Sequence, residues 1–217
     1  MGRLIETEQG FGGFNGMFTL AEMDRGSNAY CEIFRDTTGK PLVQIAADIL
    51  REKGQLRVLD AGCGTGRAIY TLREDVARQT GLPQAAIDVT GINDVDYRGK
   101  SKMVEVRRAA ASGSLRYIVQ DLDIADLSAD HYDLITSVEV LIYNGYEKAA
   151  RIVHKLTSAM APGGKMFMTL KSRQKQHLES YMRTLQSNGF KLFERSIPPF
   201  DRVAVMVEKP AVRQEQV

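Results

Sequence analysis

The feature that most constrains the fold is an alternation, from Gln55 onward, of short β-branched or apolar runs with longer segments of helical period. Such alternation is typical of a mostly parallel sheet with helices packed on it. The predicted strands are Leu56–Ala61, Ala86–Ile92, Leu115–Gln120, Tyr132–Ser137, Gly164–Leu170, Phe190–Ser196 and Arg202–Glu208. The predicted helices are Gly66–Gln79, Lys100–Ser112, Glu147–Met160 and Gln174–Asn188.

The connection between the last two predicted strands fixes their direction. Only Ile197–Asp201 separates them, which is too short for the crossover that joins parallel strands. We therefore expect these two strands to pair antiparallel. The sequence predicts an α/β fold with a seven-stranded sheet, mostly parallel with an antiparallel last strand, and helices on both faces.

The residues before the first strand have a different texture. Phe11–Gly16 is rich in glycine and aromatic residues, a predicted helix follows from Ser27 to Arg35, and a second predicted helix has Pro41 in its first turn and ends before Gly54. We expect residues 1–54 to form an N-terminal helical segment of the same domain, residues 55–209 the core, and residues 210–217 a polar tail.

Composition excludes several classes of protein. Lys and Arg number 29 against 27 Asp and Glu, so the chain has no global positive field of the kind that marks nucleic-acid binders. The two cysteines and three histidines show no metal-ligand spacing, so we predict no metal site. No apolar run approaches about 18 residues, and no secretory leader pattern begins the chain. We expect a cytoplasmic protein that does not enter a membrane.

The strongest local signal is the run Val58–Gly66, a buried strand that ends in Asp60 and continues into Gly62, Gly64 and Gly66 before a helix. Glycine lets a backbone turn sharply and approach a ligand, and a helix N-terminus offers unpaired amides. A plain turn without a ligand would need fewer glycines. The Gly-x-Gly-x-Gly spacing also differs from the Gly-x-Gly-x-x-Gly of nicotinamide-binding proteins, which disfavours a dehydrogenase.

From Pro41 to Glu208 the chain resembles the class I S-adenosylmethionine-dependent methyltransferases, whose first motif is similar to Leu59–Gly66. The resemblance implies a Rossmann-like fold, S-adenosylmethionine as cofactor and an N-terminal lid, for which Phe11–Phe18 supplies aromatic residues and glycine hinges. It also implies that the first motif contacts the amino-acid portion of the cofactor. The residues concerned are Asp60, Gly62, Cys63, Gly64 and Gly66.

Further cofactor contacts follow from the same resemblance. Asn93 stands where an acid usually holds the ribose, so either Asn93 makes the contact or the next residue, Asp94, has taken it over. Asp121 matches the residue that binds the adenine amine, and Leu122 matches the one that packs on the ring. Val138 belongs to the fourth motif, beneath the transferring methyl group. On a helix ahead of the first strand, Tyr30 is a further candidate.

Two residues after the fourth strand are candidates for catalysis. Tyr143 stands where many relatives have a histidine, and its hydroxyl could orient an acceptor; the alternative is a packing residue at a helix start. Glu139 could assist methylation of nitrogen, or hydrogen-bond the cofactor or a neighbouring backbone group.

The resemblance therefore predicts methyl transfer to oxygen or nitrogen of a small organic acceptor, in specialised (natural-product) metabolism. The near-zero net charge disfavours nucleic acid as the partner. Two alternatives stay open: an RNA or protein methyltransferase that uses the basic stretches Arg98–Arg108 and Lys171–Lys175, and a cofactor-binding protein of the same fold that does not methylate. The oligomeric state also stays open.

Overall fold

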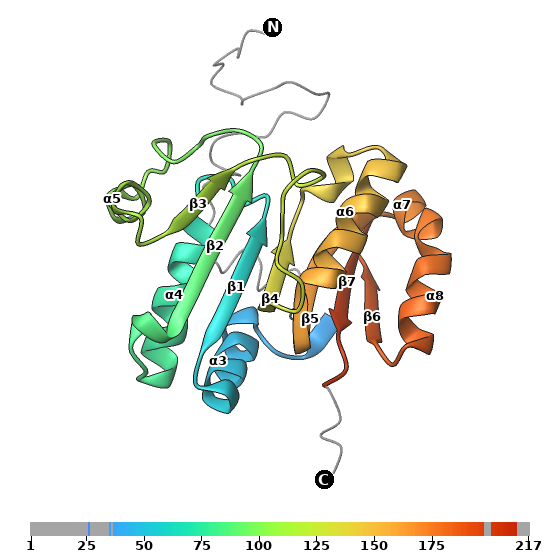
Figure 1. Ribbon diagram of the computed structural model, residues 1–217, viewed down its shortest axis with the longest axis horizontal. Coiled ribbons are helices and arrows are strands. Elements are labelled where there is room, and N and C mark those ends of the chain that lie inside the picture. Colours follow the sequence, from blue (N-terminus) through green and yellow to red (C-terminus); the bar gives the residue numbers. More distant parts are fainter. Residues whose placement is uncertain (1–25, 27–34, 36, 198–200, 212–217) are drawn as a thin grey trace, which may run out of the picture.

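The computed structural model describes residues 26, 35, 37–197 and 201–211, and its strands form one twisted sheet (Figure 1). The strand order is β3-β2-β1-β4-β5-β7-β6. Neighbouring strands from β3 to β5 pair parallel, whereas β7 runs antiparallel to both β5 and β6. This confirms the predicted fold class. The strands are β1 (Leu56–Ala61), β2 (Ile87–Asn93), β3 (Arg116–Val119), β4 (Tyr132–Ser137), β5 (Met160–Lys171), β6 (Lys191–Ser196) and β7 (Arg202–Glu208).

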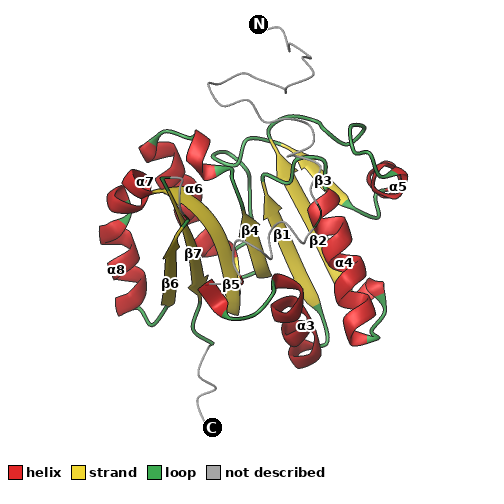
Figure 2. Cartoon of the chain, turned by 180° about the vertical axis from the view of Figure 1, so that it is seen from behind, coloured by secondary structure: helices red, strands yellow, loops and turns green. Residues whose placement is uncertain are grey.

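Helices cover both faces of the sheet, as Figures 1 and 2 show from opposite sides. The first face carries α3 (Leu42–Lys53), α4 (Arg67–Thr80) and α5 (Val104–Ser112). The second face carries α6 (Tyr146–Ala159), α7 (Ser172–His177) and α8 (Glu179–Ser187). Two short 3-10 turns, η1 (Gln84–Ala86) and η2 (Leu141–Tyr143), complete the described elements.

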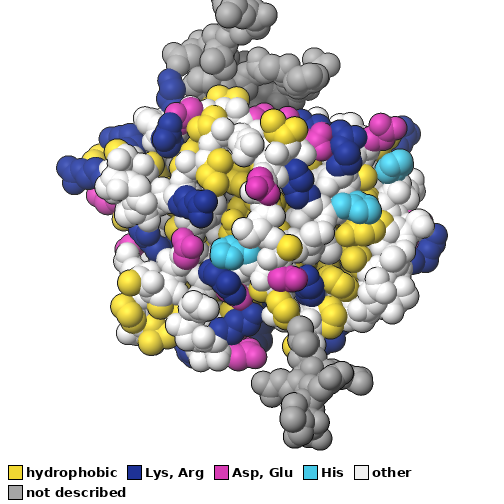
Figure 3. Space-filling view, viewed as in Figure 1, with side chains coloured by type: hydrophobic (Ala, Val, Ile, Leu, Met, Phe, Trp, Pro, Cys, Tyr) yellow, Lys and Arg dark blue, Asp and Glu magenta, His cyan; other side chains and the backbone are white. Residues whose placement is uncertain are grey.

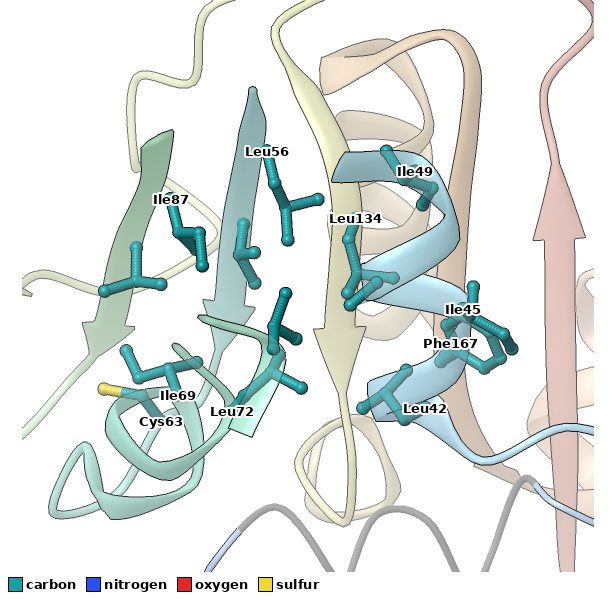
Figure 4. Packing of buried hydrophobic residues seen from close by; sticks show 14 of the residues in the cluster. Leu42, Ile45, Ile49, Leu56, Cys63, Ile69, Leu72, Ile87, Leu134 and Phe167 are labelled. Carbon is teal, nitrogen blue, oxygen red and sulfur yellow. The ribbon is translucent and has the colours of Figure 1, made fainter. Parts of the chain in front are cut away.

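Helix α3 belongs to the core of the molecule, although it precedes the first strand. Pro41 starts it, and Gly54 ends it in the left-handed conformation that glycine adopts without strain. Its apolar stripe packs on the sheet, where Ile45 lies beside Phe167 of β5, and Leu42 and Ile49 belong to the same apolar cluster (Figure 4). A second apolar cluster fills the opposite face, between the sheet and the helices α6 and α8.

Several predicted boundaries were wrong. The single helix expected over Gln174–Asn188 is two helices, α7 and α8, which meet at the buried Leu178, where the backbone has φ −84° and ψ −1°. Strand β5 begins at Met160 rather than Gly164, and its Pro-Gly-Gly run lies inside it as an irregularity between the Tyr132 and Leu134 pairings. A Cβ on Gly164 would lie 2.7 Å from the Ala161 carbonyl oxygen, which explains the glycine.

Other predictions fall outside what the structure describes. The aromatic segment Phe11–Phe18 and Tyr30 lie outside the described residues, as does the expected helix Ser27–Arg35 except for Arg35 itself.

The helix expected over Lys100–Ser112 is described, but it begins later, at Val104. None of the described helices combines the length and apolar character that crossing a bilayer requires.

A buried ionic cluster, which we call the Asp133 clamp, joins three elements near the amino ends of the parallel strands. The fully buried carboxylate of Asp133 in β4 accepts hydrogen bonds from Lys53 Nζ at 2.8 Å and from the amide of Arg57 in β1 at 2.9 Å. The guanidinium of Arg57 lies 3.3 Å from the same carboxylate. Lys53, at the end of α3, also donates to the Pro162 carbonyl. The clamp fixes α3 to the sheet at the opposite edge from the candidate site.

Candidate functional site

The predicted site residues gather at the carboxyl ends of β1 to β4, the upper edge of the sheet in Figure 1. Open α/β sheets bind ligands at this edge, where neighbouring loops diverge. The Gly62–Gly66 loop follows β1, Asn93 ends β2, Asp121 follows β3, and Glu139 follows β4. The structure therefore brings together residues that are up to 77 positions apart in the sequence, from Gly62 to Glu139.

The glycine loop has the backbone that its composition predicts. Gly62, Gly64 and Gly66 have φ values of 94°, 53° and 83°, all in the region that side chains rarely adopt. The amides of Gly62 and Cys63 donate to the Ile92 carbonyl at 2.7 and 3.1 Å, which ties the loop to β2. Helix α4 starts directly after Gly66.

Two polar side chains hold this loop from the neighbouring strands. Asn93 accepts a hydrogen bond from the Gly64 amide at 3.4 Å and donates to the Val95 carbonyl at 2.9 Å. Tyr117 of β3 donates its hydroxyl to the Gly64 carbonyl at 2.6 Å. Burial raises the pKa of the Tyr117 phenol, so this donor keeps its proton. Asn93 thus has a structural task, whereas Asp94 is exposed beside it.

Gly62 is also required by packing. A Cβ on Gly62 would overlap both methyl groups of Val140, which lies in the connection between β4 and α6. A Cβ on Gly66 would lie 2.9 Å from Leu115. The contact between Gly62 and Val140 couples the loop after β1 to the connection that carries Glu139 and Tyr143.

The other residues of the first motif point inward. Asp60 is fully buried and accepts a hydrogen bond from Thr136 of β4 at 2.8 Å. Cys63 lies against Ile69 in the core (Figure 4), and a Cβ on Gly91 would lie 2.6 Å from its sulfur. Burial, together with the charge of Asp60, raises the pKa of the Cys63 thiol, which opposes any role as a nucleophile.

Asp121 is held by the helix α6. Its carboxylate accepts from Lys148 Nζ at 2.7 Å and from the amide of Asp123 at 2.9 Å. These two hydrogen bonds, that from Lys148 being the stronger, lower the pKa of the Asp121 carboxyl and keep it ionised. Its side chain remains 41% exposed, so acceptor positions stay accessible. Leu122, the predicted contact of the adenine ring, and Val138, predicted to lie beneath the transferring methyl group, are buried in apolar clusters on opposite faces of the sheet.

Glu139 occupies an unusual backbone conformation. Its φ of 60° makes it one of two non-glycine residues with positive φ in the described part of the chain. Its amide donates to Thr169 Oγ1 at 2.6 Å, and its carboxylate accepts from the guanidinium of Arg202 at the start of β7. Residues held in such conformations cost free energy and are concentrated at functional sites.

Gln174 fixes the connection that carries Tyr143. This buried side chain of α7 donates to the carbonyls of Leu141 and Asn144, both at 2.8 Å, and accepts from the amide of Lys171 at 2.9 Å. Tyr143 lies in η2, is 38% exposed, and its amide donates to the Val140 carbonyl. Tyr143 and Glu139 are therefore placed on one short connection with a fixed backbone.

Sequence reasoning missed several of these residues. Tyr117, Thr136, Lys148, Gln174 and Arg202 each contact a predicted site residue or its connection. Gln174 alone carried a local signal, because it is the third residue of a helix, where a side chain can accept from the backbone ahead of the helix. The other four have partners on different elements.

Comparison with known proteins decides the family. A family model described as a methyltransferase domain matches residues 52–197, which is more than half of the chain. The chain belongs to the methyltransferase domain family. The family and the sheet order place this methyltransferase-domain protein in the class I S-adenosylmethionine-dependent superfamily that its motifs predicted. Comparison with curated proteins found no match.

Solved structures share the fold of this methyltransferase-domain protein at low sequence identity. A protein of Listeria monocytogenes assigned to the class I S-adenosylmethionine-dependent methyltransferases has a TM-score of 0.63 at 14% identity, over 91% of this chain and 64% of the other. The N-methyltransferase NodS of Bradyrhizobium japonicum, solved with S-adenosyl-L-homocysteine, gives 0.52 at 15% identity, over 84% and 86%. The [4+2]-cyclase SpnF gives 0.52 at 15%, over 78% and 80%.

The residues at this edge fit S-adenosylmethionine in their chemistry. The glycines at positions 62, 64 and 66 bring no side chain to the loop after β1, and the exposed Asp94 carboxylate suits a pair of ribose hydroxyls. The ionised Asp121 suits the amine of an adenine. The residues that the structure describes contain no group of three His, Cys, Asp or Glu placed to hold a metal ion.

Proposed function

We propose that this protein transfers the methyl group of S-adenosylmethionine to an oxygen or nitrogen atom of a small organic acceptor, in specialised (natural-product) metabolism. The observation that carries the proposal is the methyltransferase domain over residues 52–197, which contains every predicted cofactor residue except Tyr30. The geometry adds support, because those residues meet at one edge of the sheet.

The cofactor supplies a methyl group on a positively charged sulfur. A lone pair of the acceptor can attack this methyl carbon and displace the sulfur without help from a strong base. The tasks of this chain are then to align the acceptor and to exclude water. Tyr143 suits alignment, since it is partly exposed on a connection that Gln174 holds still. Glu139 suits it less directly, because its carboxylate binds Arg202.

Charge supports a small acceptor over a nucleic acid. Basic and acidic side chains are interspersed over the face in Figure 3. In the two basic stretches, Arg98 binds Asp96, Lys175 binds Glu194, and Arg107 donates to the Ser101 carbonyl. Binding to RNA requires several cations directed at phosphates, which these contacts oppose.

The proposal is tested by supplying S-adenosylmethionine with a labelled methyl group to the full chain together with a fractionated extract of its source. We expect label in one low-molecular-weight compound, and we expect excess S-adenosylhomocysteine to suppress it. Label in RNA or protein would replace the small acceptor by the first alternative. Calorimetric binding of the cofactor without any labelled product would favour a protein that does not methylate. The structural neighbour SpnF, which shares the fold, is described as a [4+2]-cyclase.

A further inference from the structure

We propose that Lys148 is a positioning residue, which holds the carboxylate of Asp121 in one orientation so that it accepts a hydrogen bond from the amino group of the cofactor's adenine. In this way Lys148 sets how strongly the site prefers adenine over a purine that lacks this amino group. The inference rests on the proposed function, because it takes Asp121 as a contact of the cofactor. It adds a residue of α6, outside the sequence motifs, to the recognition of the base.

The first observation is that the Asp121 carboxylate is held at both oxygens. Lys148 Nζ donates to Oδ2 at 2.7 Å, and the amide of Asp123 donates to Oδ1 at 2.9 Å. Two donors on different oxygens fix the rotation of the carboxylate group as well as its position. A carboxylate offers about four acceptor positions, of which these bonds use two. Because the side chain is 41% exposed, the other positions are open to an N–H group of a ligand.

The second observation is the place of Lys148 within its helix. Helix α6 begins at Tyr146 after the N-cap Gly145, so Lys148 is its third residue. The amino end of a helix carries a partial positive charge, beside which a lysine is unfavourable. Helix formation therefore does not explain this cation. The side chain of Lys148 is 36% exposed, and ion pairs at such exposure add little to stability. The task of the pair is then to orient Asp121 rather than to stabilise the fold.

The third observation is that two further cations of α6 hold the same loop. Arg151 donates to both carboxylate oxygens of Asp123, at 2.9 and 2.6 Å, and Lys155 donates to the carbonyls of Asp123 and Ala125, at 2.7 and 2.8 Å. Residues three and four apart lie on one face of a helix, so these cations and Lys148 form a stripe. Helix α6 lies on the near side of the sheet in Figure 1. Lys148 thus acts on a loop whose backbone is already placed.

The fourth observation is the protonation state of Asp121. The hydrogen bonds from Lys148 and from the Asp123 amide lower the pKa of the Asp121 carboxyl, against burial and the charge of Asp123. The carboxylate of Asp123 is itself bound by Arg151. An ionised carboxylate only accepts hydrogen bonds, so it suits the amino group of adenine and gains nothing from a purine with hydrogen at that position.

The test compares two ligands that differ at this one group. S-adenosylhomocysteine and its analogue with hydrogen in place of the 6-amino group are titrated separately into the full chain by calorimetry. The ratio of the two dissociation constants measures the adenine preference. We expect the wild type to prefer S-adenosylhomocysteine about tenfold or more, because the analogue lacks a hydrogen bond to a charged group.

Two variants of Lys148 separate orientation from mere bulk. Lys148→Met keeps an unbranched side chain but removes the cation, and we expect the ratio to fall at least about threefold. The fall is expected in the affinity for S-adenosylhomocysteine alone, with the analogue bound within about twofold of the wild type, since it makes no contact with the carboxylate. Lys148→Arg keeps a cation and is expected to hold the ratio within about twofold of the wild type.

Two further variants show whether Lys148 acts through Asp121. Arg151→Met is the matched control, because it removes a cation from the same helix face whose partner is Asp123. We expect it to leave the ratio within about twofold. Asp121→Ala should bring the ratio to about one, and adding Lys148→Met should change it no further, as expected of two residues that act as one unit.

Three results would overturn the inference: an unchanged ratio in Lys148→Met, an equal fall in Arg151→Met, or a further change of the ratio when Lys148→Met is added to Asp121→Ala. Each would reduce Lys148 to a cation of the loop with no task toward the base. Denaturant unfolding of Lys148→Met should give a midpoint close to that of the wild type. If this variant does not fold, Lys148→Gln takes its place in the same measurements.

Failure of the inference differs from failure of the proposed function. A wild type that binds S-adenosylhomocysteine, with the same ratio in the Lys148 variants, would leave the proposed function intact and refute the inference. A wild type that binds neither ligand would refute the cofactor and the inference together. The expected ratios without any labelled methyl product would support the task of Lys148 and refute methyl transfer.

Discussion

Asn93 and Asp94 are neighbours at the end of β2 with different surroundings. Asn93 is buried and holds the Gly64 amide, while Asp94 is exposed. We expect Asp94→Ala to weaken S-adenosylhomocysteine binding by about 1.5–3 kcal/mol without changing the free energy of unfolding, because a carboxylate makes the stronger ribose contact. Asn93→Ala is expected to lower the free energy of unfolding as well, because it leaves the loop amide without its acceptor. Calorimetry and denaturant unfolding separate the two effects.

Each variant is decided by a different measurement, cofactor binding for Asp94→Ala and stability for Asn93→Ala. An Asp94→Ala protein that binds the cofactor as the wild type does would show that the ribose is held elsewhere, and an Asn93→Ala protein of unchanged stability would remove the structural task assigned to Asn93.

A second prediction concerns the contact between Gly62 and Val140. Gly62→Ala forces a methyl group into the space of Val140 at a φ of 94°, and we expect a loss of about 1–3 kcal/mol in the free energy of unfolding. Adding Val140→Ala should recover the part due to overlap and leave the part due to the backbone. Unfolding of both single variants and the double variant gives the coupling. Additive effects would mean that the side chains do not meet.

At the scale of elements, Gln174 joins α7 to the connection after β4. We expect Gln174→Met, which keeps the length of the side chain but removes its polar atoms, to leave the carbonyls of Leu141 and Asn144 without this donor and to loosen the connection. Faster amide hydrogen exchange in residues 139–145 should accompany a loss of about 1–3 kcal/mol in stability. Met182 on α8 is a matched control site: Met182→Leu should change neither. Unchanged exchange in the Gln174 variant would show that the connection is held by other contacts.

The elements also show what a sequence can predict. The strands and the glycine loop were predicted because their signals lie in neighbouring residues: apolar runs, spacing and turn residues. The break at Leu178 was missed because the apolar period runs through it without a glycine or proline to mark a helix end. The bonds of Gln174 and the Arg202–Glu139 pair were missed because their partners lie 30 or more positions away, and no local pattern records such a distance.

The site residues divide in the same way. The motifs placed Gly64, Asn93 and Asp121 at one sheet edge, and the structure brings them there. The sequence left open whether Asn93 or Asp94 contacts the ribose; the structure adds that Asn93 accepts a hydrogen bond from the Gly64 amide, and the ribose contact stays a prediction. Whether these residues bind the cofactor, and whether Tyr143 faces the acceptor, stays a prediction.

At the scale of the whole molecule, the Asp133 clamp links stability to pH. Burial raises the pKa of Asp133, but the hydrogen bonds from Lys53 and from the amide and guanidinium of Arg57 outweigh it and lower the pKa below its ordinary 3.8. A carboxyl whose pKa is lowered by folding stabilises the protein above the ordinary value, and this stabilisation is lost as the pH falls through the folded value.

We therefore expect Asp133→Asn to lower the free energy of unfolding by about 2–3 kcal/mol at neutral pH, and the difference from the wild type to shrink below about pH 4. Denaturant unfolding of both proteins over this range checks the prediction. Asp88→Asn in β2 serves as the control for the loss of one negative charge. A difference that stays constant with pH would show that the Asp133 charge is not what stabilises the clamp.

The segment before α3 belongs to the same scale. If Phe11–Phe18 closes over the acceptor, deleting residues 1–18 should leave the affinity for S-adenosylhomocysteine within a few-fold and reduce turnover strongly, because the acceptor loses enclosure and alignment. Calorimetry and a methyl-transfer assay on the acceptor found by labelling measure the two effects. Turnover that survives the deletion would exclude the lid.

The Asp133 clamp lies at the amino ends of the strands, whereas the candidate binding residues that the structure describes lie at or near the carboxyl ends. The two ends can therefore change independently. A library of random substitutions restricted to the exposed residues Tyr143, Lys171 and Arg173 should retain a high proportion of folded variants, while the same mutational load at Lys53, Arg57 and Asp133 should not. Such a separation makes the chain a tolerant starting point for the laboratory evolution of new acceptor preferences.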